Sequence, residues 1–139
     1  MTTIRQLSVF VGNEPGKLAF IAKVLKREKI NMKAFYLSES TEFGILRAIV
    51  DDPEQAVIKL ADEGIIAKIT EVIGISVPNE PGSMYAPAKA LADENINILY
   101  AYAYASTRKE GLFLKVNDPE KACAILKKAG FQLIKETEA

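Results

Sequence analysis

Two hydrophobic spacings alternate along the chain and predict strands that alternate with helices. Residues 7–11 form an apolar run of Leu, Val and Phe around one Ser, which is typical of a core strand. A helical spacing follows, with apolar residues at i, i+3, i+4 and i+7: Leu18, Ile21, Ala22 and Leu25. Extended segments at 33–40, 45–50 and 67–72, with a second helix before the last, complete a strand-helix-strand-strand-helix-strand pattern.

Residues with special backbone preferences mark the ends of these helices. Asn13 is placed to cap the first helix, with Pro15 near its first position. Asp52 and Pro53 predict the start of the second helix, and Gly64 predicts its end. The helix boundaries therefore follow from capping chemistry as well as from periodicity.

A second copy of the pattern lies 66 residues further on. Three short motifs recur at that shift: Asn-Glu-Pro-Gly (13–16 and 79–82), Ile-Asn (30–31 and 96–97) and Asp-Pro-Glu (52–54 and 118–120). Matches at one constant shift, without a gap, indicate an internal duplication with domains at residues 1–70 and 71–139. Pro87 falls inside the first helix of the second copy, so we expect that helix to bend or to begin late.

Each copy predicts a ferredoxin-like unit of the α+β class, an antiparallel four-stranded sheet with both helices on one face. Residues 69–75, between the copies, contain neither Pro nor a polar linker. We therefore expect the last strand of one copy to run almost directly into the first strand of the next, in a fixed mutual orientation.

Composition excludes several classes of function. The 139 residues include no His and one Cys, Cys123. Imidazole-based catalysis, His-containing metal sites and intramolecular disulfides are therefore excluded, and we expect no catalytic residue, no metal and no cofactor. One Cys and the lack of an apolar signal or membrane-spanning segment lead us to expect a cytoplasmic protein without a membrane partner.

Charge and aromatic patterning disfavour a nucleic-acid partner. Lys+Arg and Asp+Glu are both 18, so the net charge is zero. Tyr100, Tyr102 and Tyr104 alternate along one predicted strand, but no Lys or Arg interleaves them as an RNA-stacking surface requires. We interpret these tyrosines as a packed or interface face. A heavy-metal carrier of this fold would need Cys-x-x-Cys, and an acylphosphatase-like enzyme would need Arg where residues 13–16 stand.

The remaining features resemble the ACT domain, a small-molecule sensing module of amino-acid metabolism. The resemblance rests on an apolar strand ending in Asn-Glu-Pro-Gly, an amphipathic helix, and Ile-Asn opening the next strand, and it covers nearly the whole chain twice. The pattern is similar to the small stand-alone tandem ACT proteins of bacteria and to the regulatory domain of phosphoglycerate dehydrogenase. It implies ACT units side by side, sheets joined into eight strands, effectors at the junction, and a homodimer.

The resemblance also implies where a ligand binds. Asn13 and Asn79 precede the Pro of each turn, and Asn31 and Asn97 open the second strand of each copy. In the phosphoglycerate dehydrogenase regulatory domain the matching asparagines bind serine. The residues after each turn complete the expected site: Gly16, Lys17 and Leu18 in the first copy, and Gly82, Ser83 and Met84 in the second.

The chemistry of such a site suits a free amino acid. The first N–H groups of a helix lack partners and favour a carboxylate, and an Asn amide can serve both the carboxylate and the ammonium. The structural interpretation is that Asn13 and Asn79 only cap helices, and that Asn31 and Asn97 only end them in the left-handed conformation. The residues alone leave both interpretations open.

We therefore expect a non-catalytic regulatory protein that binds a free amino acid and signals to a partner enzyme or regulator. Val11 and Val77 stand where the family has an effector-binding His, which favours an apolar or aromatic amino acid over serine. The alternative is a docking subunit of an amino-acid-metabolism enzyme that acts without an effector.

Overall fold

The computed structural model describes residues 2–38, 43–105 and 110–139, and the chain divides into two compact units. The first unit comprises residues 5–70, and the second comprises residues 1–4 together with 71–139. The division into one domain at residues 1–70 and a second at residues 71–139 stays a prediction.

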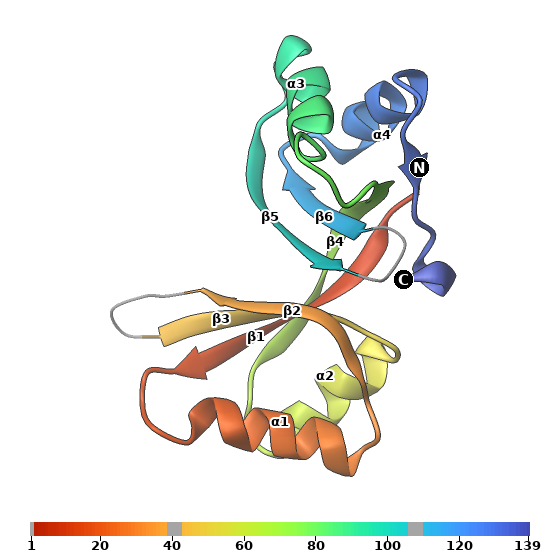
Figure 1. Cartoon of the computed structure of the whole chain (residues 1–139). Helices are drawn as coiled ribbons and strands as arrows, with labels where there is room; N and C mark the ends of the chain where they lie inside the picture. Colours follow the sequence, from red (N-terminus) through yellow and green to blue (C-terminus); the bar gives the residue numbers. More distant parts are fainter. Residues whose placement is uncertain (1, 39–42, 106–109) are drawn as a thin grey trace. The chain divides into compact units, whose positions relative to one another are not determined.

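The first unit has the predicted strand-helix-strand-strand-helix-strand order. Its strands lie side by side in the order β2-β3-β1-β4, with antiparallel pairing of β1 with β3 and of β2 with β3. Residues 39–40 of the predicted extended segment lie outside the described residues. The elements (Figure 1) are β1 (Ile4–Gly12), α1 (Lys17–Arg27), β2 (Met32–Ser38), β3 (Phe43–Val50), α2 (Pro53–Asp62) and the beginning of β4 (Ala67–Val77).

The second unit repeats this topology. Its strand order is β5-β6-β4-β7, which matches that of the first unit strand for strand. The elements after β4 are α3 (Tyr85–Asp93), β5 (Ile98–Ala105), β6 (Glu110–Val116), α4 (Pro119–Lys128), β7 (Gln132–Leu133) and a short 3-10 helix (Glu136–Glu138). The tandem ferredoxin-like fold predicted from the duplication is confirmed.

One strand serves both units. The last strand of the first copy and the first strand of the second copy are the single strand β4, Ala67–Val77. The described residues therefore hold seven strands, and the expected count of eight is wrong. The physical reason lies in the sequence between the copies, where neither Pro nor a polar linker interrupts a segment rich in Ile and Val.

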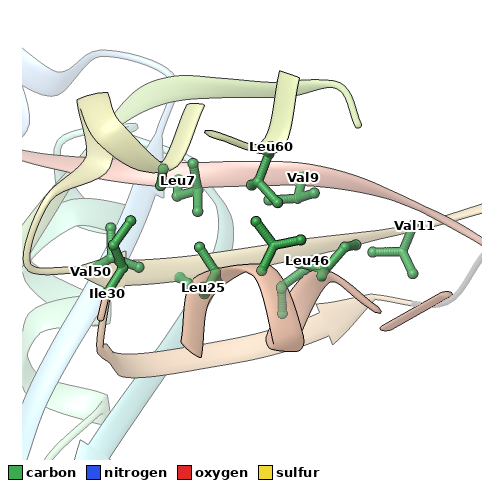
Figure 2. Packing of buried hydrophobic residues seen from close by; sticks show 12 residues of the cluster. Leu7, Val9, Val11, Leu25, Ile30, Leu46, Val50 and Leu60 are labelled. Atoms are coloured by element: carbon green, nitrogen blue, oxygen red, sulfur yellow. The ribbon is translucent and has the colours of Figure 1, made fainter. Parts of the chain in front are cut away.

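Both helices of the first unit pack on one face of its sheet. Figure 2 shows this core, to which β1 contributes Leu7, Val9 and Val11, while Leu25 comes from α1 and Leu60 from α2. Each buried aliphatic side chain stabilises the fold by roughly 1.5–3 kcal/mol. An equivalent cluster fills the second unit and includes Cys123, which confirms that this Cys is a small core residue.

The second helix of each unit begins and ends as its sequence predicts. The Asp52 carboxylate accepts a hydrogen bond from the Gln55 N–H at 3.2 Å, and Asp118 does the same for Lys121. Gly64 follows the end of α2 with φ of +77°, a left-handed conformation that glycine adopts at little cost. Capping therefore fixes both ends of this helix.

The first helix differs from the prediction at its start. Gly16, with φ of +90°, is the N-cap of α1 and has no side chain to cap the helix, so the assignment of Asn13 as the N-cap residue is wrong. Leu18 is 38% exposed, and Val24 is buried instead. The helix begins only at Lys17, so Leu18 lies in its first turn, where the helix has not yet reached the core.

The first helix of the second unit begins late, as Pro87 predicts. A shift of 66 from Lys17 gives Ser83, yet α3 begins at Tyr85. Pro87 is thereby placed in the first turn, where its missing N–H leaves no intrahelical bond unmade.

A repeated pair of hydrogen bonds joins the start of the second strand to the end of the third. The Asn31 N–H donates to Asp51 Oδ1 at 3.1 Å, and the Asp51 N–H donates to the Asn31 carbonyl at 3.3 Å. Asn97 and Asn117 make the same two bonds in the second unit. Asn31 and Asn97 contribute only backbone groups to these bonds, and the side-chain acceptors come from Asp51 and Asn117.

The cap of α2 gives the first testable prediction. Asp52→Ala should destabilise the protein by about 1 kcal/mol, because the Gln55 N–H loses its acceptor. Asp62→Ala is the matched control, since Asp62 lies at the opposite end of the same helix, where a negative charge is unfavourable. Urea unfolding should show a lower free energy of unfolding for Asp52→Ala only. An equal decrease for Asp62→Ala would contradict the capping role.

The repeated pair of hydrogen bonds between Asn31 and Asp51 gives a second prediction. Asp51→Ala should cost about 1 kcal/mol, since it removes the acceptor for the Asn31 N–H. Asn31→Ala keeps both backbone groups and should change stability by less than about 0.5 kcal/mol. Urea unfolding of the two variants compares them directly. A loss for Asn31→Ala as large as that for Asp51→Ala would mean that the Asn31 side chain is structural.

Candidate functional site

The turn after β1 is tight, and residues 12–18 are exposed. The Glu14 N–H donates to the Gly12 carbonyl at 2.9 Å, and the Lys17 N–H donates to the Glu14 carbonyl at 3.3 Å. A Cβ atom built on Gly12 would lie 3.4 Å from Lys17 Cγ, so the Lys17 stem packs over this glycine. The structure thus brings Asn13, Gly16, Lys17 and Leu18 together at one end of the unit.

The turn after β4 has the same backbone design. The Glu80 N–H donates to the Pro78 carbonyl at 3.0 Å, and the Ser83 N–H donates to the Glu80 carbonyl at 3.2 Å. Gly82 has φ of +87°, close to that of Gly16. Asn79, Gly82 and Met84 are exposed and Ser83 is half-buried, so this copy also groups its predicted site residues.

The two helix starts offer different numbers of N–H groups. In α1 the Phe20 N–H donates to the Gly16 carbonyl at 3.0 Å. The N–H groups of Leu18 and Ala19 have no acceptor among the residues that the structure describes. In the second unit the N–H groups of Tyr85 and Ala86 both reach Gly82, and Pro87 has none. The start of α1 is therefore the better equipped to hold an anion.

Asn31 and Asn97 lie away from these turns. Each directly precedes its strand, β2 or β5, at the far end of the first helix of its unit. Since α1 has 11 residues, the two ends are about 16 Å apart. Within one unit, therefore, the structure does not bring the turn asparagine and the strand asparagine together.

The side chains of Asn31 and Asn97 are exposed, and neither amide has a hydrogen-bond partner within residues 2–38, 43–105 and 110–139. The residues in the left-handed conformation are Lys29 and Asn95, each with φ of 59°, and not Asn31 and Asn97. The interpretation of Asn31 and Asn97 as left-handed helix ends is thus wrong by two residues.

Val11 and Val77 do not reach the turn surface. Both are buried in the cores of their units, at 5% and 4% exposure. The predicted preference for an apolar ligand therefore loses the support of these two positions. Leu18 in the first unit and Met84 with Tyr85 in the second supply the exposed apolar surface beside the turns instead.

Sequence reasoning missed a polar group on the strands of the first unit. Gln6 is fully buried, and its amide donates to the Thr70 hydroxyl at 2.9 Å; Ser8 Oγ lies 3.3 Å from the same oxygen. Arg47 donates to the Tyr36 hydroxyl at 3.0 Å. Comparison of the copies gives the signal, because Gln6, Ser8 and Arg47 match Val72, Gly74 and Phe113 at the shift of 66.

Two of the three tyrosines of β5, Tyr102 and Tyr104, are packed side chains, as the sequence indicates. Tyr102 is 9% exposed, with its ring centroid 5.5 Å from that of Phe113, and the Tyr104 ring stacks on the same Phe at 5.8 Å. A Cβ on Gly111 would lie 2.7 Å from Tyr104 Cε1, so this glycine makes room for the ring.

Among the described residues, no group of three or more Cys, Asp or Glu side chains is placed to hold a metal ion. Nor is any helix in that part of the chain long and apolar enough to cross a membrane.

Known structures reproduce this architecture. A Bacteroides thetaiotaomicron protein of known structure is 34% identical, with a TM-score of 0.94, and the match covers 99% of this chain and 95% of that chain. The ligand-free regulatory subunit of aspartate kinase from Thermus thermophilus is 17% identical (TM-score 0.66, covering 91% and 92%). The corresponding subunit from Thermus flavus is 15% identical (TM-score 0.59, covering 93% of each chain).

At such identities the two kinase subunits are similar to this chain in fold alone. No curated protein matches the sequence. The family model described as an ACT domain pair matches residues 1–139, the full length of the chain. With the duplicated ferredoxin-like topology, this match shows that the protein belongs to the ACT domain family, as an ACT domain pair.

Proposed function

We propose that the protein is a non-catalytic regulatory module that binds a free amino acid and relays that binding to a partner enzyme or regulator in the cytoplasm. The observation that carries the proposal is the repeated placement of Asn31 and Asn97. The fold uses only their backbones, yet both copies present the same exposed amide. A ligand that needs an amide accounts for this repetition.

The turn and the strand asparagine would share the charged groups of the ligand. The N–H groups of Leu18 and Ala19 suit the carboxylate, and an Asn amide oxygen suits the ammonium. Because one unit holds these groups about 16 Å apart, a site takes its turn from one copy and its asparagine from another. Ligand binding then favours the arrangement of copies that forms the site, which is the basis of regulation.

The surface beside the turns favours a ligand with an apolar or aromatic side chain over serine. Leu18 is 38% exposed, Met84 47% and Tyr85 66%. A ligand that covers exposed apolar groups next to a polar site removes them from water, which makes binding more favourable.

A second candidate function rests on β2. This strand ends the strand order of its unit, and Phe35 and Leu37 on it are 57% and 47% exposed. An apolar sheet edge favours pairing with another chain. That chain is a second copy in the homodimer we propose, or a catalytic partner if the protein is an effector-independent docking subunit.

A thermal-shift screen against the twenty amino acids tests the leading proposal. A binder at about 100 times its Kd should stabilise the protein by about 2.7 kcal/mol, a shift of several degrees. Asn31→Ala or Asn97→Ala should reduce that shift, whereas Gln55→Ala, an exposed amide on α2, should retain it. A flat screen at millimolar ligand would contradict the sensor, and capture of a partner enzyme lost in Phe35→Lys would then support docking.

Titration calorimetry with the amino acid found should give one tight site per chain, because α1 offers more N–H groups than α3. Two equal sites would contradict this inequality. The same titration on variants identifies the second contributor to the site. Loss of the tight site in Asn97→Ala assigns it to the other copy of the same chain, and loss in Asn31→Ala assigns it to a second chain.

A further inference from the structure

A pocket of about 220 Å³ lies on the second unit, and none of the turn residues lines it. Small-molecule pockets usually measure roughly 300–1,000 Å³, so this one suits a ligand of fewer than about ten non-hydrogen atoms. Its lining, called here the α4 pocket, consists of Thr2, Glu120, Cys123, Ala124, Lys127 and Leu133.

The middle of the α4 pocket is apolar. Four of its residues follow the i, i+3, i+4, i+7 spacing of one helix face, with Cys123 and Ala124 in the middle. The Cys123 thiol donates to the Thr2 carbonyl at 3.5 Å, which holds the N-terminal residues beside α4. Burial raises the pKa of this thiol, so it stays neutral at physiological pH.

Opposite charges stand at the two ends. Glu120 lies in the first turn of α4 and Lys127 in the last, about 10.5 Å apart along the axis. Neither makes an ion pair or a side-chain hydrogen bond with any residue that the structure describes.

The first unit shows that the fold does not require this charge arrangement. The equivalents of Glu120 and Lys127 on α2 are Glu54 and Ala61. Glu54 is paired with Arg5, whereas the equivalent of Arg5 in the second unit is Glu71, an acid that cannot pair with Glu120. The second unit has therefore lost the internal partner of its acid and gained a cation at the other end.

We propose that the α4 pocket binds a small elongated zwitterion, an ω-amino acid with a carboxylate at one end and an ammonium at the other. Lys127 receives the carboxylate and Glu120 the ammonium. The methylene chain between them covers Cys123 and Ala124. This site is independent of the turn asparagines.

Titration with 6-aminohexanoate, followed by ¹H–¹⁵N correlation spectra of the full chain, tests the proposal. Amides of α4 and Leu133 should shift with a Kd in the millimolar range, and hexanoate and hexylammonium should bind more weakly. Lys127→Ala and Glu120→Gln should each weaken binding by about 1.5-fold to fivefold, the range of exposed ion pairs. Lys128→Ala, on the same helix but outside the pocket, is the matched control and should change nothing, as should Asn31→Ala and Asn97→Ala.

A second readout uses the single Cys. Saturating 6-aminohexanoate should slow alkylation of Cys123 by iodoacetamide in the native protein at alkaline pH, where part of the thiol is ionised and reactive. Absence of shifts at tens of millimolar ligand, equal affinity for hexanoate, or equal weakening by Lys128→Ala would each overturn the proposal.

Discussion

The alternation of side chains along β1 and β4 is the constraint that fixes both units. Leu7, Val9 and Val11 face the helices, so the residues that alternate with them, Gln6, Ser8 and Phe10, are directed to the opposite face of the sheet. In β4 the same period directs Ile73, Ile75 and Val77 into the second core. The strands end where this burial ends, and the exposed turns begin there.

Much of the fold could be predicted because the same residue types mark the helix boundaries in both copies. Asp52 and Asp118 cap equivalent helices, and Gly64 and Gly130 end them with positive φ. These signals are local, since the capping group and the N–H that it satisfies are three residues apart. The late start of α3 was predictable for the same reason, because the effect of a proline is confined to its own turn.

The errors occurred where tertiary contacts decide. Asn13 is a residue type that is common at helix N-caps, but the left-handed Gly16 is the N-cap of α1. Val11 matches a ligand-binding position in the family pattern, yet the strand period turns it into the core. For the candidate site, the sequence supplied only the candidate residues, and the distance between the turn and the strand asparagine within a unit follows from the length of α1.

Differences between the copies separate what the fold needs from what it tolerates. The pair of hydrogen bonds at Asn31 and at Asn97 is kept in both units, because it joins the start of the second strand to the end of the third. The pairs Arg47 and Phe113, or Arg5 and Glu71, share a position but not a chemistry. One unit thereby keeps half-buried hydroxyls and an arginine, and the other keeps stacked aromatic rings.

The continuity of β4 also bears on how such a chain can evolve. A residue inserted early in this strand would turn Ile73, Ile75 and Val77 away from their core and direct Gly74 and Ser76 into it. Lineages that descend from this duplication can lengthen their loops freely, but they can change the length of β4 only in pairs of residues. The join between the copies should therefore be the slowest part of the gene to accept insertions.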